Sequence, residues 1–95
     1  MIVGKTEKGF EFEVNENIGN DFRIVMAVRK LKSDDKIAKV EGTYDYVEAI
    51  LGKSGIDKMI KFATKQVGYP DSDFIIAQAE EILAIANEGN PEIKK

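Results

Sequence analysis

The chain has 95 residues, a formal net charge of −3 and no Cys, His or Trp. Without Cys or His it has no thiol nucleophile, no usual zinc ligands and no base with an unperturbed pKa near neutrality, so most enzyme mechanisms are excluded. We therefore expect no catalytic residue, no metal and no cofactor. The net charge argues against nucleic acid as the main partner, and no apolar run approaches the roughly 20 residues that span a membrane.

A β-hairpin is predicted over residues 1–14. Residues 10–14 alternate apolar and acidic side chains with the two-residue period of a half-buried strand. Residues 7–9 connect this strand to the preceding one, with Gly9 where a left-handed backbone is needed after a type I turn. The register follows, because a one-residue shift would bury the acidic side chains of this strand. The residues expected to face the protein body are Phe10, Phe12 and Val14.

A loop over residues 15–20 leads to a first helix, expected from Asp21 to about Lys32. The apolar residues of this segment are too many for one narrow helical face, so we expect this helix to be the most enclosed of the protein. They are Phe22, Ile24, Val25, Met26, Ala27, Val28 and Leu31.

Residues 33–35 are expected to end that helix and to cap a second one. Gly42 can divide the second helix into two shorter ones, Gly52 is expected to end it, and Ser54 is expected to begin a third. Apolar residues recur at intervals of three and four in both segments, which predicts that they face the core. They are Ile37, Val40, Tyr44, Val47 and Leu51 in the second helix, and Ile56, Met59, Ile60, Ala63 and Val67 in the third.

Gly68 and Pro70 form a strong stop, after which residues 71–73 place capping oxygens and negative charge at the start of a last helix that ends near Gly89. The residues of this helix expected to face the core are Ile75, Ile76, Ala79, Ile82, Leu83 and Ala86.

These elements predict an α+β, mainly α fold, in which an N-terminal β-hairpin is followed by a compact body of four to five short helices. The hairpin occupies residues 1–14 and the helical body residues 21–89. Residues 1–89 are expected to form a single compact domain, and residues 90–95 a short frayed tail. Met1 is followed at once by strand-like residues without a basic or apolar leader, which indicates a cytoplasmic protein.

Two short motifs have the beginnings of a ligand site but lack essential positions. The Gly-Lys-Ser of residues 52–54 could close a phosphate-binding loop, but that loop needs a glycine where Val47 stands. Asp71 and Asp73 have the spacing that opens a calcium loop, whose closing glutamate position holds Ile82. We assign both motifs to helix ends.

A protein interface is predicted on apolar residues that lie beside the core-facing stripes. The candidate protein-binding residues are Phe74 and Ile85, on an outer line of the last helix that also holds Gln78 and Glu81, and then Tyr46 and Ile50. A basic stripe of Lys58, Lys61 and Lys65 lies on the third helix. No aromatic residues interleave with these lysines, so a solvated face or an acidic protein partner is favoured over nucleic acid.

Two stretches of the chain resemble tail assembly chaperones of long-tailed (siphovirus-type) phages and prophages of Gram-positive bacteria. The first is residues 8–18, Lys-Gly-Phe-Glu-Phe-Glu-Val-Asn-Glu-Asn-Ile, followed by Asp-Phe-Arg at residues 21–23. The second is Val-Glu-Ala-Ile-Leu-Gly at residues 47–52, which is similar to the leucine-glycine helix end in the middle of those proteins. The basic, apolar first helix departs from the pattern.

The resemblance implies a non-catalytic protein that binds the tape measure protein and helps to recruit tail tube (major tail) subunits during tail morphogenesis. Its partners would be these two proteins and further copies of the chain, in the host cytoplasm, with neither nucleic acid nor membrane. The alternative is a small phage-borne regulatory or inhibitor module that binds a protein through one fixed interface. A nucleic-acid binder would use the lysine stripe.

Overall fold

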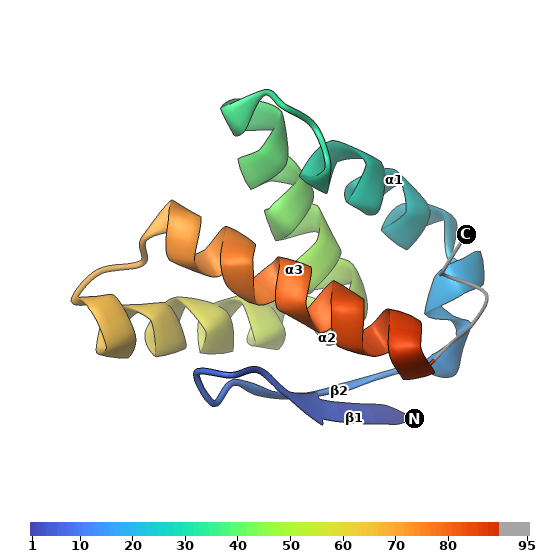
Figure 1. Ribbon diagram of the computed structural model, residues 1–95, viewed down its shortest axis with the longest axis horizontal. Coiled ribbons are helices and arrows are strands. Elements are labelled where there is room, and N and C mark those ends of the chain that lie inside the picture. Colours follow the sequence, from blue (N-terminus) through green and yellow to red (C-terminus); the bar gives the residue numbers. More distant parts are fainter. Residues whose placement is uncertain (90–95) are drawn as a thin grey trace.

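The computed structural model describes residues 1–89 and consists there of two strands, a 3-10 helix and three α-helices (Figure 1). In chain order the elements are β1 (Ile2–Lys5), β2 (Glu11–Val14), η1 (Glu16–Asn20), α1 (Phe22–Leu31), α2 (Lys36–Val67) and α3 (Ser72–Gly89). The hairpin lies below α3 and the end of α2, while α1 and the start of α2 lie above them (Figure 1). The predicted tail, residues 90–95, lies outside the described residues.

The predicted hairpin is confirmed, but the predicted body of four to five short helices is wrong, because the body has three α-helices. Helix α2 continues through Gly42, which was a possible break. At Gly52, the predicted helix end, the backbone is non-helical and two helical segments meet across a kink. Gly52 has φ 77° and ψ −179°, a backbone conformation that is strained for residues with a Cβ. The bend divides α2 into a first half, residues 36–51, and a second half, residues 53–67, which diverge (Figure 1).

The hairpin turn has the predicted geometry. Gly9 has φ 105°, and the Thr6 N–H donates to the Phe10 carbonyl oxygen at 2.9 Å. The antiparallel register pairs Gly4 with Phe12 and leaves the acidic side chains of β2 exposed. The three residues predicted to face the body, Phe10, Phe12 and Val14, are all buried.

Each α-helix begins behind an aspartate whose carboxylate accepts a hydrogen bond from a backbone N–H of the first turn, as predicted. The pairs are Asp21 with Arg23 at 2.9 Å, Asp35 with Ala38 at 3.0 Å and Asp71 with Phe74 at 2.9 Å. Gly68, with φ 102°, ends α2 in the left-handed conformation. Residues 15–20, expected to be a loop, form η1, which begins behind the side chain of Asn15.

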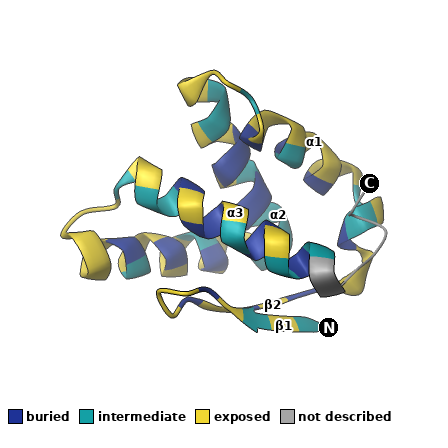
Figure 2. Ribbon diagram, viewed as in Figure 1, coloured by how far each residue is buried: buried dark blue, intermediate teal, exposed yellow. Residues whose placement is uncertain are grey.

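The prediction that the first helix is the most enclosed is wrong. Helix α1 packs against α2 and η1 with one side only, and its buried residues are Ile24, Ala27 and Leu31. Its opposite side faces solvent, so most of the residues of α1 are exposed (Figure 2).

The core-facing stripes predicted for α2 are only partly correct. In the first half Val47 is buried, but Ile37, Val40 and Tyr44 are exposed, because the side that carries Gly42 and Tyr46 faces inward. A Cβ on Gly42 would lie 2.4 Å from the Leu31 backbone nitrogen, so this glycine lets α1 and α2 come into backbone contact there. In the second half Met59 and Ala63 are buried, whereas Ile60 and Val67 are exposed.

The stripe predicted for α3 is correct. Ile75 is half-buried, and the other five predicted residues are buried. One hydrophobic core joins residues of β2, η1 and all three α-helices. Within residues 1–89, no helix combines the length and the hydrophobicity that crossing a bilayer requires.

Candidate protein-binding surfaces

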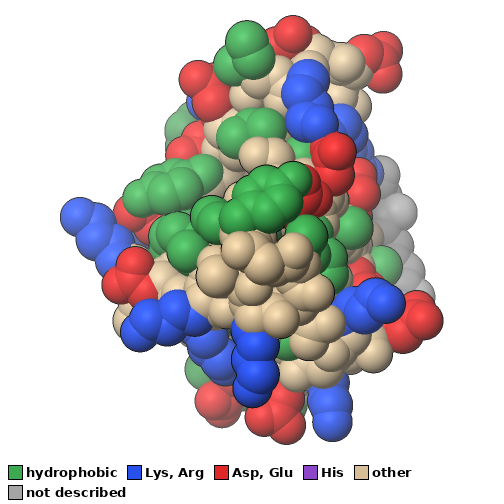
Figure 3. Space-filling model, turned by 90° about the vertical axis from the view of Figure 1, so that its left-hand side faces the viewer, with side chains coloured by type: hydrophobic (Ala, Val, Ile, Leu, Met, Phe, Trp, Pro, Cys, Tyr) green, Lys and Arg blue, Asp and Glu red, His purple; other side chains and the backbone are tan. Residues whose placement is uncertain are grey.

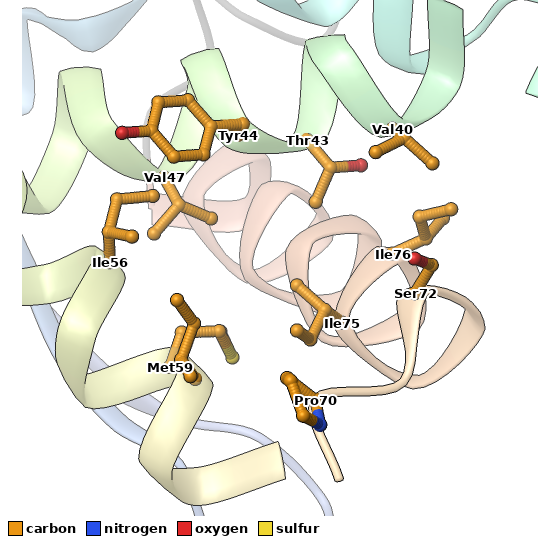
Figure 4. Close-up of a pocket in the computed structure, with 11 residues that line it drawn as sticks. Val40, Thr43, Tyr44, Val47, Ile56, Met59, Pro70, Ser72, Ile75 and Ile76 are labelled. Atoms are coloured by element: carbon orange, nitrogen blue, oxygen red, sulfur yellow. The ribbon is translucent and has the colours of Figure 1, made fainter. Parts of the chain in front are cut away.

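An apolar pocket of about 210 Å3 opens between the two halves of α2 and the start of α3 (Figure 4). Its walls diverge because α2 bends at Gly52, which sets Val47 of the first half opposite Met59 of the second. Pro70 and Ile75 close a third side. The full lining is Val40, Thr43, Tyr44, Val47, Ile56, Met59, Ile60, Pro70, Ser72, Ile75 and Ile76.

The side chains that line the pocket are almost all apolar. Its polar side chains are Thr43, Ser72 and the hydroxyl end of Tyr44. The Thr43 hydroxyl donates to the Lys39 carbonyl oxygen at 2.8 Å, so it is already paired within the helix. The floor includes buried Met59, whose flexible thioether side chain can adjust to differently shaped apolar groups.

Exposed apolar residues border the pocket and extend it over the surface. Tyr44 and Ile60 are 49% and 41% exposed, and Val40 is also exposed. Ile37 lies one helical turn before Val40 and is exposed as well. We call these four residues the pocket rim. Hydrophobic side chains gather in the middle of this face, with charged side chains around them (Figure 3). Such a continuous apolar patch around a hollow is typical of a protein-binding surface.

A second exposed apolar surface lies on α1. Phe22, Val25 and Met26 are 77%, 51% and 39% exposed, and their spacing places them on one side of the helix. We call these three residues the α1 face. A shallow groove borders it, with Phe22 and Met26 on the α1 side and Asp45, Glu48 and Ala49 on the α2 side.

Other elements pack over the side of α3 that carries Phe74 and Ile85, so the prediction that this side faces solvent is wrong. Both are half-buried, and Gln78 between them is only 2% exposed. The hairpin packs on this side of α3, where a Cβ added to Gly4 would lie 3.0 Å from Cγ2 of Ile85. The ring of Phe74 lies 5.9 Å from that of Phe62 on α2. The Glu81 carboxylate on the same line accepts a hydrogen bond from the Glu7 backbone N–H.

Tyr46 and Ile50 also lie inside. Tyr46 was expected to be partly exposed, but it is completely buried, and burial strongly raises the pKa of its hydroxyl. Within the described part of the chain that hydroxyl has no hydrogen-bond partner. Ile50 is half-buried against the core. None of the four candidate residues therefore belongs to the pocket rim or to the α1 face.

The lysine stripe is not a uniform solvated face. Lys58 Nζ donates to the Glu11 carbonyl oxygen at 2.8 Å and lies 5.0 Å from the centre of the Phe10 ring. Lys58 thus connects the hairpin to α2, whereas Lys61 and Lys65 form no ion pair with another described residue. Among residues 1–89, no group of three acidic side chains is placed to hold a metal ion.

Shifted pKa values occur at the helix starts. A hydrogen bond from the Arg23 guanidinium lowers the pKa of Asp21, and one from the Tyr69 hydroxyl lowers the pKa of Asp71. The same carboxylate raises the pKa of Tyr69. These aspartates are also the capping residues of α1 and α3, and the capping backbone N–H groups lower their pKa values further, by less than the two side-chain hydrogen bonds do.

Sequence reasoning missed the pocket rim because Val40, Tyr44 and Ile60 occupy positions that repeat like a core stripe. The available signal was Gly52, which was expected to end a helix, since a kink at this position separates the apolar faces on either side of it. For the α1 face the signal was the surplus of apolar residues beyond those that one buried side can hold.

Comparisons with protein families, curated proteins and solved structures gave no match to this chain. The fold defines it as a small, mainly helical protein, and its described residues carry two exposed apolar surfaces.

Proposed function

We propose that the protein is a non-catalytic tail assembly chaperone of a long-tailed phage or prophage. In the host cytoplasm it binds the tape measure protein and, as an oligomer, helps to recruit tail tube subunits. The observation that carries this proposal is the apolar pocket with its exposed rim. The resemblance of residues 8–23 and 47–52 to such chaperones supports it independently.

A tape measure protein is long and helical, so its apolar stripes need cover until the tube forms around it. A helix that presents such a stripe can lie across the pocket rim and insert one side chain into the pocket. The volume of about 210 Å3 suits a single aromatic or branched aliphatic group, since a cavity of about 150 Å3 holds benzene. The Met59 floor lets successive client segments fit the same site.

Co-expression with a tape measure protein of a long-tailed phage tests the proposal. The wild-type chain is expected to keep that protein soluble, and the double variant Tyr44→Ser/Ile60→Ser is expected to lose the effect. Val67→Ser is the matched control, because Val67 is 43% exposed on the same helix but does not line the pocket. Both variants should fold, since exposed substitutions change stability by less than about 0.5 kcal/mol in most cases.

Two results would contradict the proposal. Failure of the wild-type chain to keep the tape measure protein soluble would remove the chaperone assignment and favour a regulatory module. If the double variant kept the tape measure protein as soluble as the wild type does, the pocket would not be part of the binding surface. Gene order gives a further check, because a chaperone gene should have an overlapping downstream frame and a very long coiled-coil gene beyond it.

A further inference from the structure

Helix α1 combines an exposed apolar side with charges of one sign. Its ten residues include Arg23, Arg29 and Lys30 but no Asp or Glu, in a chain whose net charge is −3. Arg29 follows Val25 by four residues and Met26 by three, so it continues the α1 face by one turn. Lys32 follows directly after the helix. The solvent side of α1 is therefore apolar at its start and basic at its end.

The charges of α1 differ in whether they have a partner. Arg23 binds the Asp21 carboxylate through Nε at 3.2 Å and Nη2 at 2.8 Å, and Lys30 Nζ lies 3.4 Å from Asp45 Oδ2. Arg29 and Lys32 form no ion pair with any residue in the described range 1–89. Positive charge without a partner thus remains at one end of the α1 face.

We propose that the α1 face, together with Arg29, docks an acidic amphipathic helix of a partner protein. The partner's apolar side chains would cover Phe22, Val25 and Met26, and its carboxylates would lie beside Arg29 and Lys32. The groove between α1 and α2 widens this surface, because Met26 and Ala49 both line it. At its edge the charges of Arg23 and Asp21, and of Lys30 and Asp45, offset each other in ion pairs, and Glu48 adds one acidic side chain on the α2 side.

Charge and the apolar side chains together favour this occupant over three others. A second α1 would bring basic residues against basic residues. A nucleic acid would offer no aliphatic stripe to cover Phe22, Val25 and Met26. Helix α1 has only three exposed apolar side chains, which is fewer than a helix needs to anchor in lipid.

Two synthetic helical peptides of about 18 residues test the proposal with the whole chain. Both carry the same leucine stripe, flanked by glutamates in one peptide and by lysines in the other. Fluorescence anisotropy should show at least about tenfold tighter binding of the acidic peptide at low salt, weakening as salt is raised. Phe22→Ser/Met26→Ser should lower the affinity about tenfold or more, and Arg29→Glu should lower it for the acidic peptide only.

Lys53→Glu is the matched control for Arg29→Glu, because Lys53 is an exposed cation at the α2 bend and the change in net charge is the same. It should leave binding unchanged. Circular dichroism should show melting temperatures within about 4 °C of the wild type for every variant.

Three results would overturn the proposal. The two peptides could bind with equal affinity, Lys53→Glu could weaken binding as much as Arg29→Glu does, or Phe22→Ser/Met26→Ser could leave the affinity unchanged. Tighter binding to vesicles containing phosphatidylserine, or self-association that the Phe22 variant abolishes without any peptide binding, would assign the face to lipid or to a second copy instead. No tape measure protein is present in this assay, so its failure leaves the pocket and the proposed function untouched.

Discussion

The ring of Phe12 lies over Gly4, its antiparallel partner across the hairpin. A Cβ on Gly4 would lie 2.6 Å from Cζ of Phe12 and 3.0 Å from Cγ2 of Ile85. The missing side chain therefore makes room for the ring exactly where the hairpin meets α3. This one position joins both strands and the last helix.

Gly4→Ala should destabilise the protein by about 1–3 kcal/mol, because the new methyl group overlaps a buried ring and a helix side chain. Urea unfolding followed by circular dichroism measures this. Val3→Ala, at the exposed neighbouring position, should change the unfolding free energy by less than about 1 kcal/mol. Equal stability of Gly4→Ala and wild type would show that the Phe12 ring can move away freely.

Gly42→Ala should destabilise the protein more than Gly4→Ala does, lowering the unfolding free energy by about 3 kcal/mol or more. Here the added Cβ meets backbone atoms, at 2.4 Å from the Leu31 nitrogen and 2.7 Å from the Lys30 carbonyl carbon, which cannot turn aside as a ring can. Glu41→Ala, one residue earlier and exposed, serves as the control in the same unfolding experiment. A gain in stability at Gly42, from the better helix propensity of Ala alone, would contradict the close approach of α1 and α2.

Tyr46→Phe should leave the stability at neutral pH unchanged or raise it by up to about 1 kcal/mol, because it removes a buried hydroxyl that has no partner among residues 1–89. The effect should grow in alkali. Burial raises the folded-state pKa of Tyr46 above its unfolded value of about 10, so the wild type loses stability as the pH rises past that value. Thermal melts between pH 7 and pH 11 should show that loss in the wild type and a smaller one in Tyr46→Phe. Parallel curves would indicate that the hydroxyl reaches solvent.

Phe74→Ser and Ile85→Ser should each lower the unfolding free energy by about 1–3 kcal/mol, since both side chains are half-buried against other elements. Ala84→Ser, at an exposed position beside Ile85, should have almost no effect. Chemical denaturation of the three variants distinguishes covered from free surface on α3. Wild-type stability of Ile85→Ser would mean that the hairpin does not rest on this helix.

The parts of the fold that the sequence predicts are those with local causes. Gly9 makes the hairpin turn, Asp35 and Asp71 cap helices, and Gly68 ends one, and each effect depends on neighbouring residues only. The outer line of α3 could not be predicted, because the strand that covers Ile85 lies at the other end of the described chain.

The candidate surfaces follow the same rule. The period of apolar residues in α2 is a local property and shows that a helix forms, whereas the side that faces the core depends on where α1 docks. Contact at Gly42 turns Tyr46 inward and leaves Tyr44 exposed, and the bend at Gly52 then opens the pocket beside it. The first of these steps is tertiary, so the four residues chosen from the sequence alone missed the exposed rim.

The packing of β1 on α3 also sets an order of events during synthesis. The hairpin is local and can close early, but two strands alone are marginal in water, and their apolar side needs the helix that is translated last among residues 1–89. Helix α2 can already contact Phe10 through Lys58 and Phe62, but the side of β1 that carries Gly4 stays uncovered until α3 has been made. We therefore expect the strand pair to gain its full stability only once Ile85 lies over Gly4.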